Sequence, residues 1–489
     1  MPVFSPRRYQ PPYYPVHRDG AAMRAFTAME RTIKGAVWLS YVRELHLAGD
    51  RVRLSHDLPH GSAQRPVRRR IAPEHCAVDP SRPCTWYTIY ARAEKMGRLD
   101  KLLEINAPLD GNRTGHETWI DMVQQWRKRD EGPHPIELIT DRKKFAQEMD
   151  DFFHDLRQPD WWEGDAEYHP PAYDEPISRL DAALRTGDFV VTAEIAPPLG
   201  ASAKTIEKKA ELLREVVVAA NFTDNASASA RMSSVACSKI CLDLGLEPVM
   251  QLQARDRTRV ALESEAMGAA ALGIHNILCL SGDHQCCGPS PVGKPDQSDM
   301  DAVQVLWMLR RMRDEGKYLD GRTTKQRPQF FLGAAASPFG APPKYEAIRA
   351  EKKINAGAQF IQTQPIFDVD GFTDWLEALD KRNLLGKVAI LAGMVPLKSA
   401  NAAHFMADGV PGVMIPPQIV ARMDACGDDK EAQQETGVAI ALEIIDRLKA
   451  LPGIRGLHIM AVHWEEIVPR LVEEGGLRAT APMVAEMMG

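Results

Sequence analysis

A carboxylate stands near the end of an apolar run at residues 189–196, which a pair of prolines stops. Glu194 is the ionisable residue of this run. The run has the length and β-branched content of a buried parallel strand, and an ionisable group at the carboxyl end of such a strand opens toward the catalytic face of an α/β barrel. A strand-end carboxylate that caps a neighbouring helix or pairs with a lysine is the alternative interpretation.

Polar side chains also stand at or just beyond the ends of most other apolar runs in this part of the chain. They are Thr223 with Asp224 and Asn225, Gln251 with Gln253 and Arg255, Asp283, Ser337, Gln364, and His463 with Trp464. This concentration favours a catalytic Glu194 over a structural one, because chemistry in an α/β barrel takes place where the strands end.

The elements that position these residues follow a regular alternation of short apolar runs and helix-like segments. Strands are predicted at 189–196, 220–224, 248–253, 276–282, 330–336, 360–365, 388–395 and 456–462. Segments 204–218, 235–245, 257–272, 301–313, 344–356, 371–382 and 435–451 have apolar residues at i, i+3 and i+4. Eight such units predict an α/β fold, a (β/α)8 TIM barrel with an extra amino-terminal domain.

Composition and local character divide the chain into three parts. The 489 residues are 44% hydrophobic and 26% charged, with a net charge of −6, as expected of a soluble protein that does not bind nucleic acid. A proline-rich stretch at 158–178 predicts a linker between an amino-terminal domain (1–157) and the barrel (179–489). The start has no apolar leader and no membrane-length apolar run occurs, so a cytoplasmic protein is expected, with its eight cysteines reduced.

Several other motifs resemble sites but lack a part that the chemistry needs. Residues 288–294 imitate a phosphate-binding loop, but prolines remove the amides that would hold phosphate and Pro295 replaces the required Ser or Thr. Cys237 and Cys241 share a helix face without a second ligand pair, and Cys76 with Cys84 does not complete a tetrahedral site. No metal site is therefore predicted.

The barrel segment resembles methylenetetrahydrofolate reductases, and most closely those of the acetogen type, across nearly all of residues 185–480. The resemblance rests on TAEIAPP at 192–198, NFTDN at 221–225, ILCLSGD at 277–283, KINAGAQFIQTQPIFD at 353–368 and GLHIMA at 456–461. The order and spacing of these motifs are highly specific.

This resemblance implies a non-covalent FAD in the barrel mouth and a hydride transfer that reduces 5,10-methylenetetrahydrofolate to 5-methyltetrahydrofolate. NAD(P)H or a protein would donate the electrons, and a homo-oligomer is expected. Glu194 matches the catalytic acid, which protonates a folate nitrogen to open the substrate's five-membered ring. Asp283 matches the second catalytic group, a carboxylate between pterin and flavin, and Gln364 matches the amide that contacts the folate.

The resemblance also implies a set of cofactor contacts. They are Thr223, Asp224, Ala226, Gln251, Ser281, Gly282, Asp283 and Lys353, with Lys353 at the diphosphate. Two positions depart from the better-known bacterial pattern, because Ala402 replaces a glutamine and Trp464 replaces an arginine that contact folate. Trp464 by stacking, or a basic side chain such as Arg255, is expected to hold the folate tail instead.

A shorter stretch of the amino-terminal domain, Cys76 to Leu103, resembles the cysteine-rich small subunit that accompanies the acetogen-type enzymes. No cysteine precedes Cys76, so the metal or iron–sulfur site of that subunit is expected to be lost. The remaining domain would then serve as a structural cap or a dimer element.

Two further functions stay open at this stage. The same site could run in the opposite direction, as a methyltetrahydrofolate oxidase in one-carbon catabolism. A flavin-free folate-binding scaffold on a degenerate barrel is the alternative from another class, and the presence of Glu194, Asp283 and Gln364 argues against it.

Overall fold

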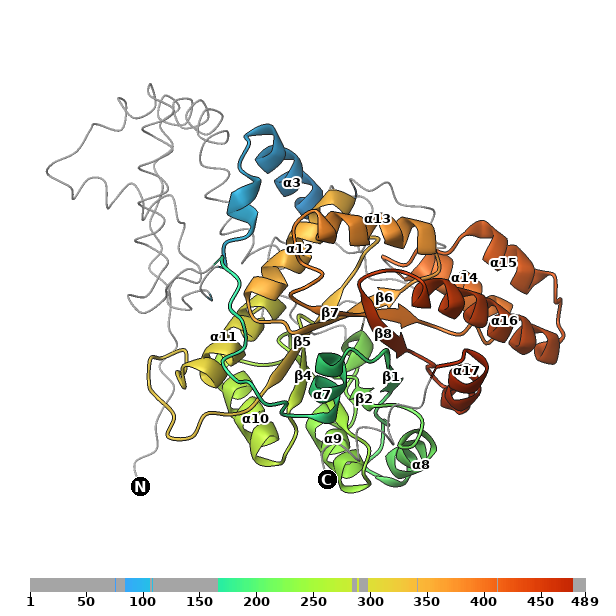
Figure 1. Cartoon of the computed structure of the whole chain (residues 1–489). Coiled ribbons are helices and arrows are strands. Elements are labelled where there is room, and N and C mark those ends of the chain that lie inside the picture. Colours follow the sequence, from blue (N-terminus) through green and yellow to red (C-terminus); the bar gives the residue numbers. More distant parts are fainter. Residues whose placement is uncertain are drawn as a thin grey trace, which may run out of the picture. The chain divides into compact units, whose positions relative to one another are not determined.

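The computed structural model describes residues 75, 84–105, 108 and 166–477, without 284–287, 290–297, 341 and 411. Eight parallel strands form a closed barrel in sequence order, which confirms the predicted fold (Figure 1). The strands are β1 (Val190–Ile195), β2 (Ala219–Phe222), β3 (Pro248–Gln253), β4 (Asn276–Leu280), β5 (Phe331–Ala336), β6 (Phe360–Pro365), β7 (Ala389–Met394) and β8 (Ile454–Ile459).

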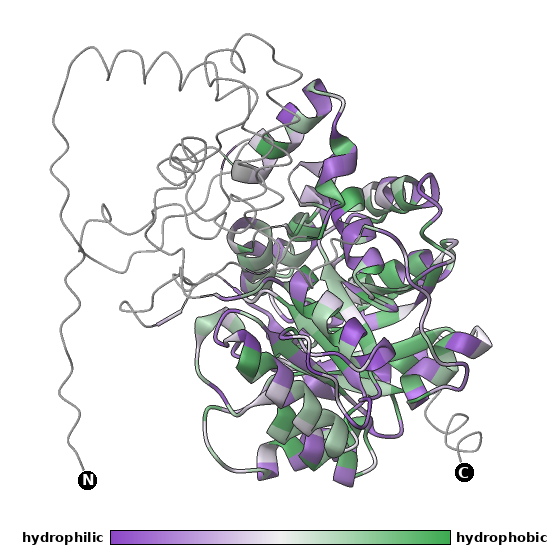
Figure 2. Cartoon of the chain, turned by 90° about the vertical axis from the view of Figure 1, so that its left-hand side faces the viewer, coloured by the Kyte–Doolittle hydropathy of each residue, from purple (hydrophilic) through white to green (hydrophobic). Residues whose placement is uncertain are grey.

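Helices surround the barrel, and all seven predicted helical segments overlap one of them. These are α8 (Lys204–Leu213), α9 (Ser234–Asp243), α10 (Arg259–Ala271), α11 (Ala302–Asp314), α12 (Pro343–Asn355), α13 (Val369–Asp380) and α16 (Lys430–Lys449). Capping side chains fix many starts; Asp301, for example, forms a capping box with Gln304 at α11. Figure 2 shows hydrophilic and hydrophobic residues together on these helices, as expected where one face packs on the strands.

Further helices follow β7 and β8 or flank the barrel. They are α7 (Arg179–Thr186), α14 (Ala400–Gly409), α15 (Pro417–Asp424), α17 (Val468–Glu474) and the short 3-10 helix η6 (Glu465–Ile467). β8 begins two residues earlier than predicted and ends at Ile459. His463 and Trp464 therefore lie in the turn beyond this strand, and His463 has a left-handed φ of 59°.

The interior of the barrel is layered because alternate residues of each strand point inward. An apolar cluster fills the amino-terminal end and packs under α7; it includes Val190, Val249, Leu278, Phe331 and Phe360. Gly333 is required here, since a Cβ would lie 2.2 Å from the Phe360 ring. On β1, β2, β6 and β8 the next inward positions toward the carboxyl end are polar, and the strand ends above them carry the candidate site.

The described part of the amino-terminal region lies against α12. Its helix α3 (Thr85–Lys95), followed by the 3-10 helix η1 (Leu99–Leu102), places Trp86 on Tyr345 with ring centroids 5.5 Å apart. The Arg349 guanidinium lies 5.8 Å from the centre of the Trp86 ring. The predicted domain boundaries stay predictions, because residues 1–74, 76–83 and most of 106–165, Cys76 among them, lie outside the described residues.

The described end of the predicted linker packs on the barrel. Tyr173 accepts a hydrogen bond from Gln359 at 2.5 Å, and the guanidinium groups of Arg185 and Arg313 lie over its ring. Within the described residues, none of the helices has the length and apolar character needed to span a membrane. The same residues contain no cluster of three or more potential metal ligands.

Candidate active site

Glu194 lies at the carboxyl end of β1 with its side chain 16% exposed. Its Oε2 atom accepts a hydrogen bond from the Gln251 amide on β3 at 3.3 Å and lies 3.7 Å from Nε2 of His458 on β8. No lysine or helix end among the described residues accounts for this carboxylate. Instead of capping a helix or pairing with a lysine, the Glu194 carboxylate lies beside two side-chain nitrogens, those of Gln251 and His458.

Asp283 lies in the loop after β4, where its carboxylate accepts a hydrogen bond from the Ser227 backbone amide at 2.6 Å. Ser227 belongs to the 3-10 turn η3 (Ala226–Ala228) that follows β2. Asn225, Ser227 and Ala228 all have left-handed φ values, between 46° and 55°, which cost free energy in residues other than glycine. Such strain is concentrated at functional loops, and here it places an amide on Asp283.

Gly282 precedes Asp283 and has a φ of 88°, a conformation that glycine adopts without strain. A Cβ at this position would lie 2.3 Å from Oε1 of Gln253 and 3.1 Å from the side chain of Arg255. The preceding residue, Ser281, accepts a hydrogen bond from the first amide of α11 through its hydroxyl at 3.1 Å. The backbone of the loop after β4 therefore lies directly against the side chains of Gln253 and Arg255, with no room for a Cβ at position 282.

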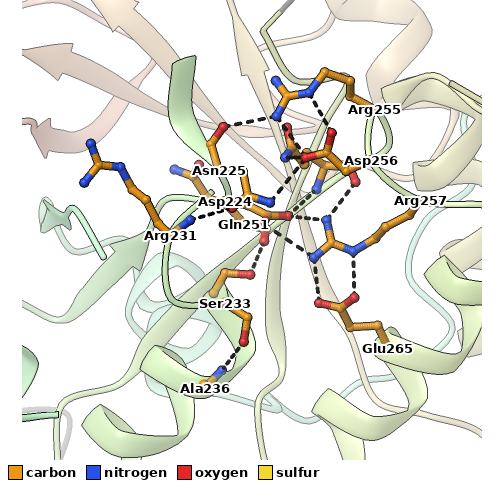
Figure 3. A network of polar contacts seen from close by, with 12 residues as sticks. Asp224, Asn225, Arg231, Ser233, Ala236, Gln251, Arg255, Asp256, Arg257 and Glu265 are labelled. Atoms are coloured by element: carbon orange, nitrogen blue, oxygen red, sulfur yellow. Dashed lines mark hydrogen bonds and ion pairs between the residues drawn. The ribbon is translucent and has the colours of Figure 1, made fainter. Parts of the chain in front are cut away.

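Arg255 joins the loops that follow β2, β3 and β4, as Figure 3 shows in part. Its guanidinium donates to the Asp283 carbonyl at 2.6 Å, the Asn225 carbonyl at 3.1 Å and both carboxylate oxygens of Asp256 at 3.0 Å. The side chain is only 8% exposed. Four of the five guanidinium N–H groups are thus used within the protein, which disfavours the hypothesis that Arg255 holds a folate tail.

If the mouth binds FAD, as the family resemblance implies, replacing Arg255 by lysine is expected to weaken this binding about tenfold, because an ammonium group cannot reach three loops at once and a lost charge-assisted hydrogen bond costs about 1.5 kcal/mol. Quenching of flavin fluorescence during titration measures this. Arg322→Lys is the matched control, since Arg322 is an exposed arginine paired with Asp320 away from the site. Equal FAD affinity in both variants would contradict the idea that Arg255 holds the three loops in place for FAD.

Asp224 is almost completely buried at the end of β2 and is paired with Arg257. The Arg257 guanidinium contacts Asp224 at 2.6 Å and Glu265 at 2.6 Å, and the Gln253 amide donates to Asp224 at 3.0 Å (Figure 3). Burial raises the pKa of Asp224 above its usual range, although Arg257 and the Gln253 amide act in the opposite direction. Asp224 thus organises the loop, and its oxygens already have partners.

Replacing Arg257 by methionine is expected to lower the free energy of unfolding by about 3–5 kcal/mol, because the buried Asp224 carboxylate loses its counter-charge. Urea unfolding followed by circular dichroism measures the loss. Arg470→Met removes an arginine that also bridges two carboxylates, Glu435 and Glu474, but on the surface, and should have a much smaller effect. Similar losses in the two variants would show that burial of the Asp224 pair is unimportant.

Two predicted cofactor contacts have polar atoms available to a ligand. The Thr223 hydroxyl is buried and has no hydrogen-bond partner among the described residues. Lys353, on α12, donates from Nζ to the Ala335 carbonyl at the end of β5 at 2.6 Å, and no carboxylate in the described chain contacts it. Burial, followed by the charge of Arg349, lowers the pKa of Lys353 to about 8 against the opposing charges of Glu346 and Asp301.

The predicted folate contacts differ in what they offer. The Gln364 side chain, at the end of β6, is half-buried and makes no hydrogen bond to any described residue, so both its donor and its acceptor are available. Trp464 is only 9% exposed and packs in the core, with the Lys398 ammonium 5.7 Å from the centre of its ring. The predicted stacking on Trp464 is therefore not supported. Ala402 lies in the first turn of α14.

Sequence reasoning missed a polar layer directly below Glu194. Thr192, Asn221, Gln362 and His458 lie inside the barrel and hydrogen-bond to one another. Their signal was present in the alternation of the strands, since Thr192 precedes Glu194 by two residues and Gln362 precedes Gln364 by two. The last strand was predicted two residues too late, which drew attention to His463 and away from His458.

Comparison with known proteins identifies the family of the barrel segment. The family model for methylenetetrahydrofolate reductase matches residues 179–476, which is more than half of the chain. The chain belongs to the methylenetetrahydrofolate reductase family. A second model, methylene-tetrahydrofolate reductase C terminal, matches residues 70–112 of this reductase-family chain, the stretch in which the small-subunit resemblance lies.

Individual relatives in the methylenetetrahydrofolate reductase family are distant. The chain is 27% identical over 239 residues to methylenetetrahydrofolate reductase 1 of Schizosaccharomyces pombe, covering 48% of this chain and 36% of the relative. It is 25% identical over 238 residues to the 5,10-methylenetetrahydrofolate reductase of Escherichia coli, covering 48% and 72%. The chain thus spans little more than a third of the yeast relative's length.

Among solved structures, the chain is similar to an uncharacterised protein from Clostridium thermocellum that binds two copies of 5-methyl-5,6,7,8-tetrahydrofolic acid. The identity is 15%, the coverage is 63% of this chain and all of the other, and the TM-score is 0.44. This likeness is too low to carry a conclusion about the reductase-family chain.

Proposed function

We propose that this protein binds FAD non-covalently in the barrel mouth and reduces 5,10-methylenetetrahydrofolate to 5-methyltetrahydrofolate, with electrons from NAD(P)H. The observation that carries the proposal is the family match over residues 179–476, together with Glu194, Asp283 and Gln364 at the strand ends of the same barrel. The family is generally flavin-dependent, and the residues around the mouth offer groups that suit this cofactor.

The cofactor fits the side of the mouth formed by β2, β4 and β5. Thr223 offers a buried hydroxyl without a partner among the described residues, and Lys353 offers an ammonium group for the diphosphate. Gly282 contributes by letting the loop after β4 lie against Gln253 and Arg255. Gln251 donates to Glu194, so its proposed role moves from the cofactor to the catalytic acid. Asp224 is proposed to act indirectly, by holding the loop after β3 through Gln253 and Arg257. When bound, FAD supplies the hydride.

The remaining chemistry belongs to side chains of the protein. Glu194 is proposed to give its proton to a folate nitrogen, which opens the five-membered ring to a reactive iminium. Gln251 orients this carboxyl group through the hydrogen bond to Oε2. Asp283, fixed by the Ser227 amide through one oxygen, can accept from the amino edge of the pterin through the other, and Gln364 can pair with the pterin rim.

Spectroscopy of the purified full-length protein tests this function. We expect a yellow protein whose flavin band is bleached anaerobically by NADH or NADPH and restored by methylenetetrahydrofolate. Bleaching with each donor separately identifies the electron source, and adding methyltetrahydrofolate to the oxidised protein measures the reverse direction. A colourless protein that does not bind added FAD would overturn the proposal.

A further inference from the structure

Four polar side chains form a connected layer inside the barrel, one inward position below Glu194. Thr192, Asn221, Gln362 and His458 come from β1, β2, β6 and β8, and each is at most 3% exposed. TIM-barrel interiors are normally filled by branched apolar side chains, and buried polar groups lower stability unless they are hydrogen-bonded. These four side chains therefore depend on hydrogen bonds to one another, and their arrangement in the barrel needs an explanation beyond packing.

The two amides of the layer fix each other's orientation. Asn221 donates to Oε1 of Gln362 at 2.6 Å, and Gln362 donates back to Oδ1 of Asn221 at 3.0 Å. This pairing leaves the second N–H of Gln362 facing two neighbours, the Thr192 hydroxyl at 3.3 Å and Nδ1 of His458 at 3.4 Å. The same nitrogen lies 3.0 Å from the hydroxyl of Thr192, whose other acceptor, the Leu457 carbonyl, is farther away at 3.3 Å.

The tautomer of His458 follows from these neighbours. The amide nitrogen of Gln362 can only donate, so its position beside Nδ1 disfavours a proton on that atom, and the Thr192 hydroxyl can donate to Nδ1 at 3.0 Å. We therefore assign Nδ1 as the acceptor and place the proton of the neutral ring on Nε2. Nε2 is the atom that faces Oε2 of Glu194, at 3.7 Å. This separation is longer than a hydrogen bond, so donation from Nε2 requires the Glu194 carboxylate to move toward the ring.

We propose that His458 is a positioning residue for Glu194, held by Thr192, Gln362 and Asn221 so that its Nε2–H donates to the Glu194 carboxylate. This inference rests on the proposed role of Glu194 as proton donor. When Glu194 gives its proton to the folate nitrogen, the electron pair of the O–H bond stays on the carboxylate, and Nε2–H of His458 and the Gln251 amide stabilise it together.

The tautomer can be measured without substrate or activity. In full-length protein labelled with 15N-histidine, the signals that disappear in His458→Gln belong to His458. We expect them to report a neutral ring protonated at Nε2, and Thr192→Val, which removes the hydroxyl but keeps the shape, to raise the Nδ1–H population. A ring protonated at Nδ1 in the unmodified protein would overturn the inference even if the protein proves to be a folate reductase.

Half-reaction kinetics separate positioning from structure. We expect His458→Phe to slow reoxidation of the reduced flavin by methylenetetrahydrofolate roughly 10- to 100-fold, with flavin reduction by the donor and the folate KM changed less than about twofold. His458→Gln, whose amide can still donate, should recover part of the rate, and Thr192→Val should show the same pattern more weakly. His275→Gln, at the amino-terminal start of β4, is the control.

A last experiment combines His458→Phe with Glu194→Gln and measures flavin reoxidation in the double variant. If His458 acts through Glu194, the second substitution adds less than about twofold to the loss. Independent, multiplying losses would overturn the proposal, as would equal slowing of both half-reactions or loss of bound FAD. Should His458→Phe fail to fold, the Gln and Val variants still give both the tautomer and the kinetic answer.

Discussion

Glu194→Gln is expected to lower the rate of methylenetetrahydrofolate reduction about a thousandfold while the protein keeps its FAD. The amide has the size of the carboxyl group and can still contact Gln251, but it cannot supply a proton, and general acid catalysis contributes about 10²- to 10⁴-fold. Stopped-flow absorbance should show normal bleaching by the electron donor and very slow reoxidation by the folate.

The matched control is Glu211→Gln, a change of the same kind at an exposed position of α8. This variant should have the kinetics of the unmodified protein in both half-reactions. Reoxidation of Glu194→Gln at a normal rate would return Glu194 to a structural role. Loss of flavin from that variant would assign Glu194 to cofactor binding instead.

Lys353→Met is expected to raise the Kd for FAD about 10- to 100-fold at pH 7, because a charge-assisted hydrogen bond to the diphosphate contributes about 1.5–3 kcal/mol. The unmodified protein should also lose affinity as the pH rises. With a Lys353 pKa of about 8 in the free protein, FAD binding above this pH requires uptake of a proton, so the Kd should rise about fivefold between pH 8 and pH 9.

Lys353→Arg separates charge from shape, since arginine stays charged over this whole range and the FAD affinity of this variant should not decrease between pH 8 and pH 9.

The stability of the protein gives a second test, in which the measured quantity should increase with pH. The pKa of Lys353 is about 8 in the folded protein, whereas an unperturbed lysine has a pKa of 10.5, so the unfolded chain binds more protons between these values. The flavin-free protein should therefore gain stability as pH rises through this window, and Lys353→Arg should lack this gain. If the FAD affinities of the unmodified protein and of Lys353→Arg changed with pH in the same way, Lys353 would be excluded from the diphosphate site.

The barrel was predictable because strand and helix periods recur along the chain. Strands β3 and β6 were predicted with their observed limits, since Pro248 and Pro365 mark one end of each run. The unpredicted α14 and α15 lie within the long segment after β7, where Gly409, Gly412 and the prolines at 411, 416 and 417 interrupt the helical pattern. Element limits thus depended on local signals.

The candidate site was only partly predictable, because a family motif identifies a position and does not reveal its contacts. Glu194, Asp283 and Gln364 were placed correctly at strand ends. Arg255 and Trp464 were expected to face a ligand, but Arg255 has its donors occupied by three loops and Trp464 is covered by the core. Whether a polar side chain is available depends on tertiary neighbours, which are distant in sequence.

The apolar cluster beneath the polar layer has a consequence for the timing of catalysis. Val190, Phe331 and Phe360 are buried in the apolar cluster under α7, so the amino-terminal end of the barrel is filled by side chains below Glu194. Solvent can then reach this carboxyl group through the mouth, which folate would cover if it binds there as proposed. In that case each turnover would use a proton that Glu194 acquired before the substrate arrived, and recovery of the acid would wait for product departure.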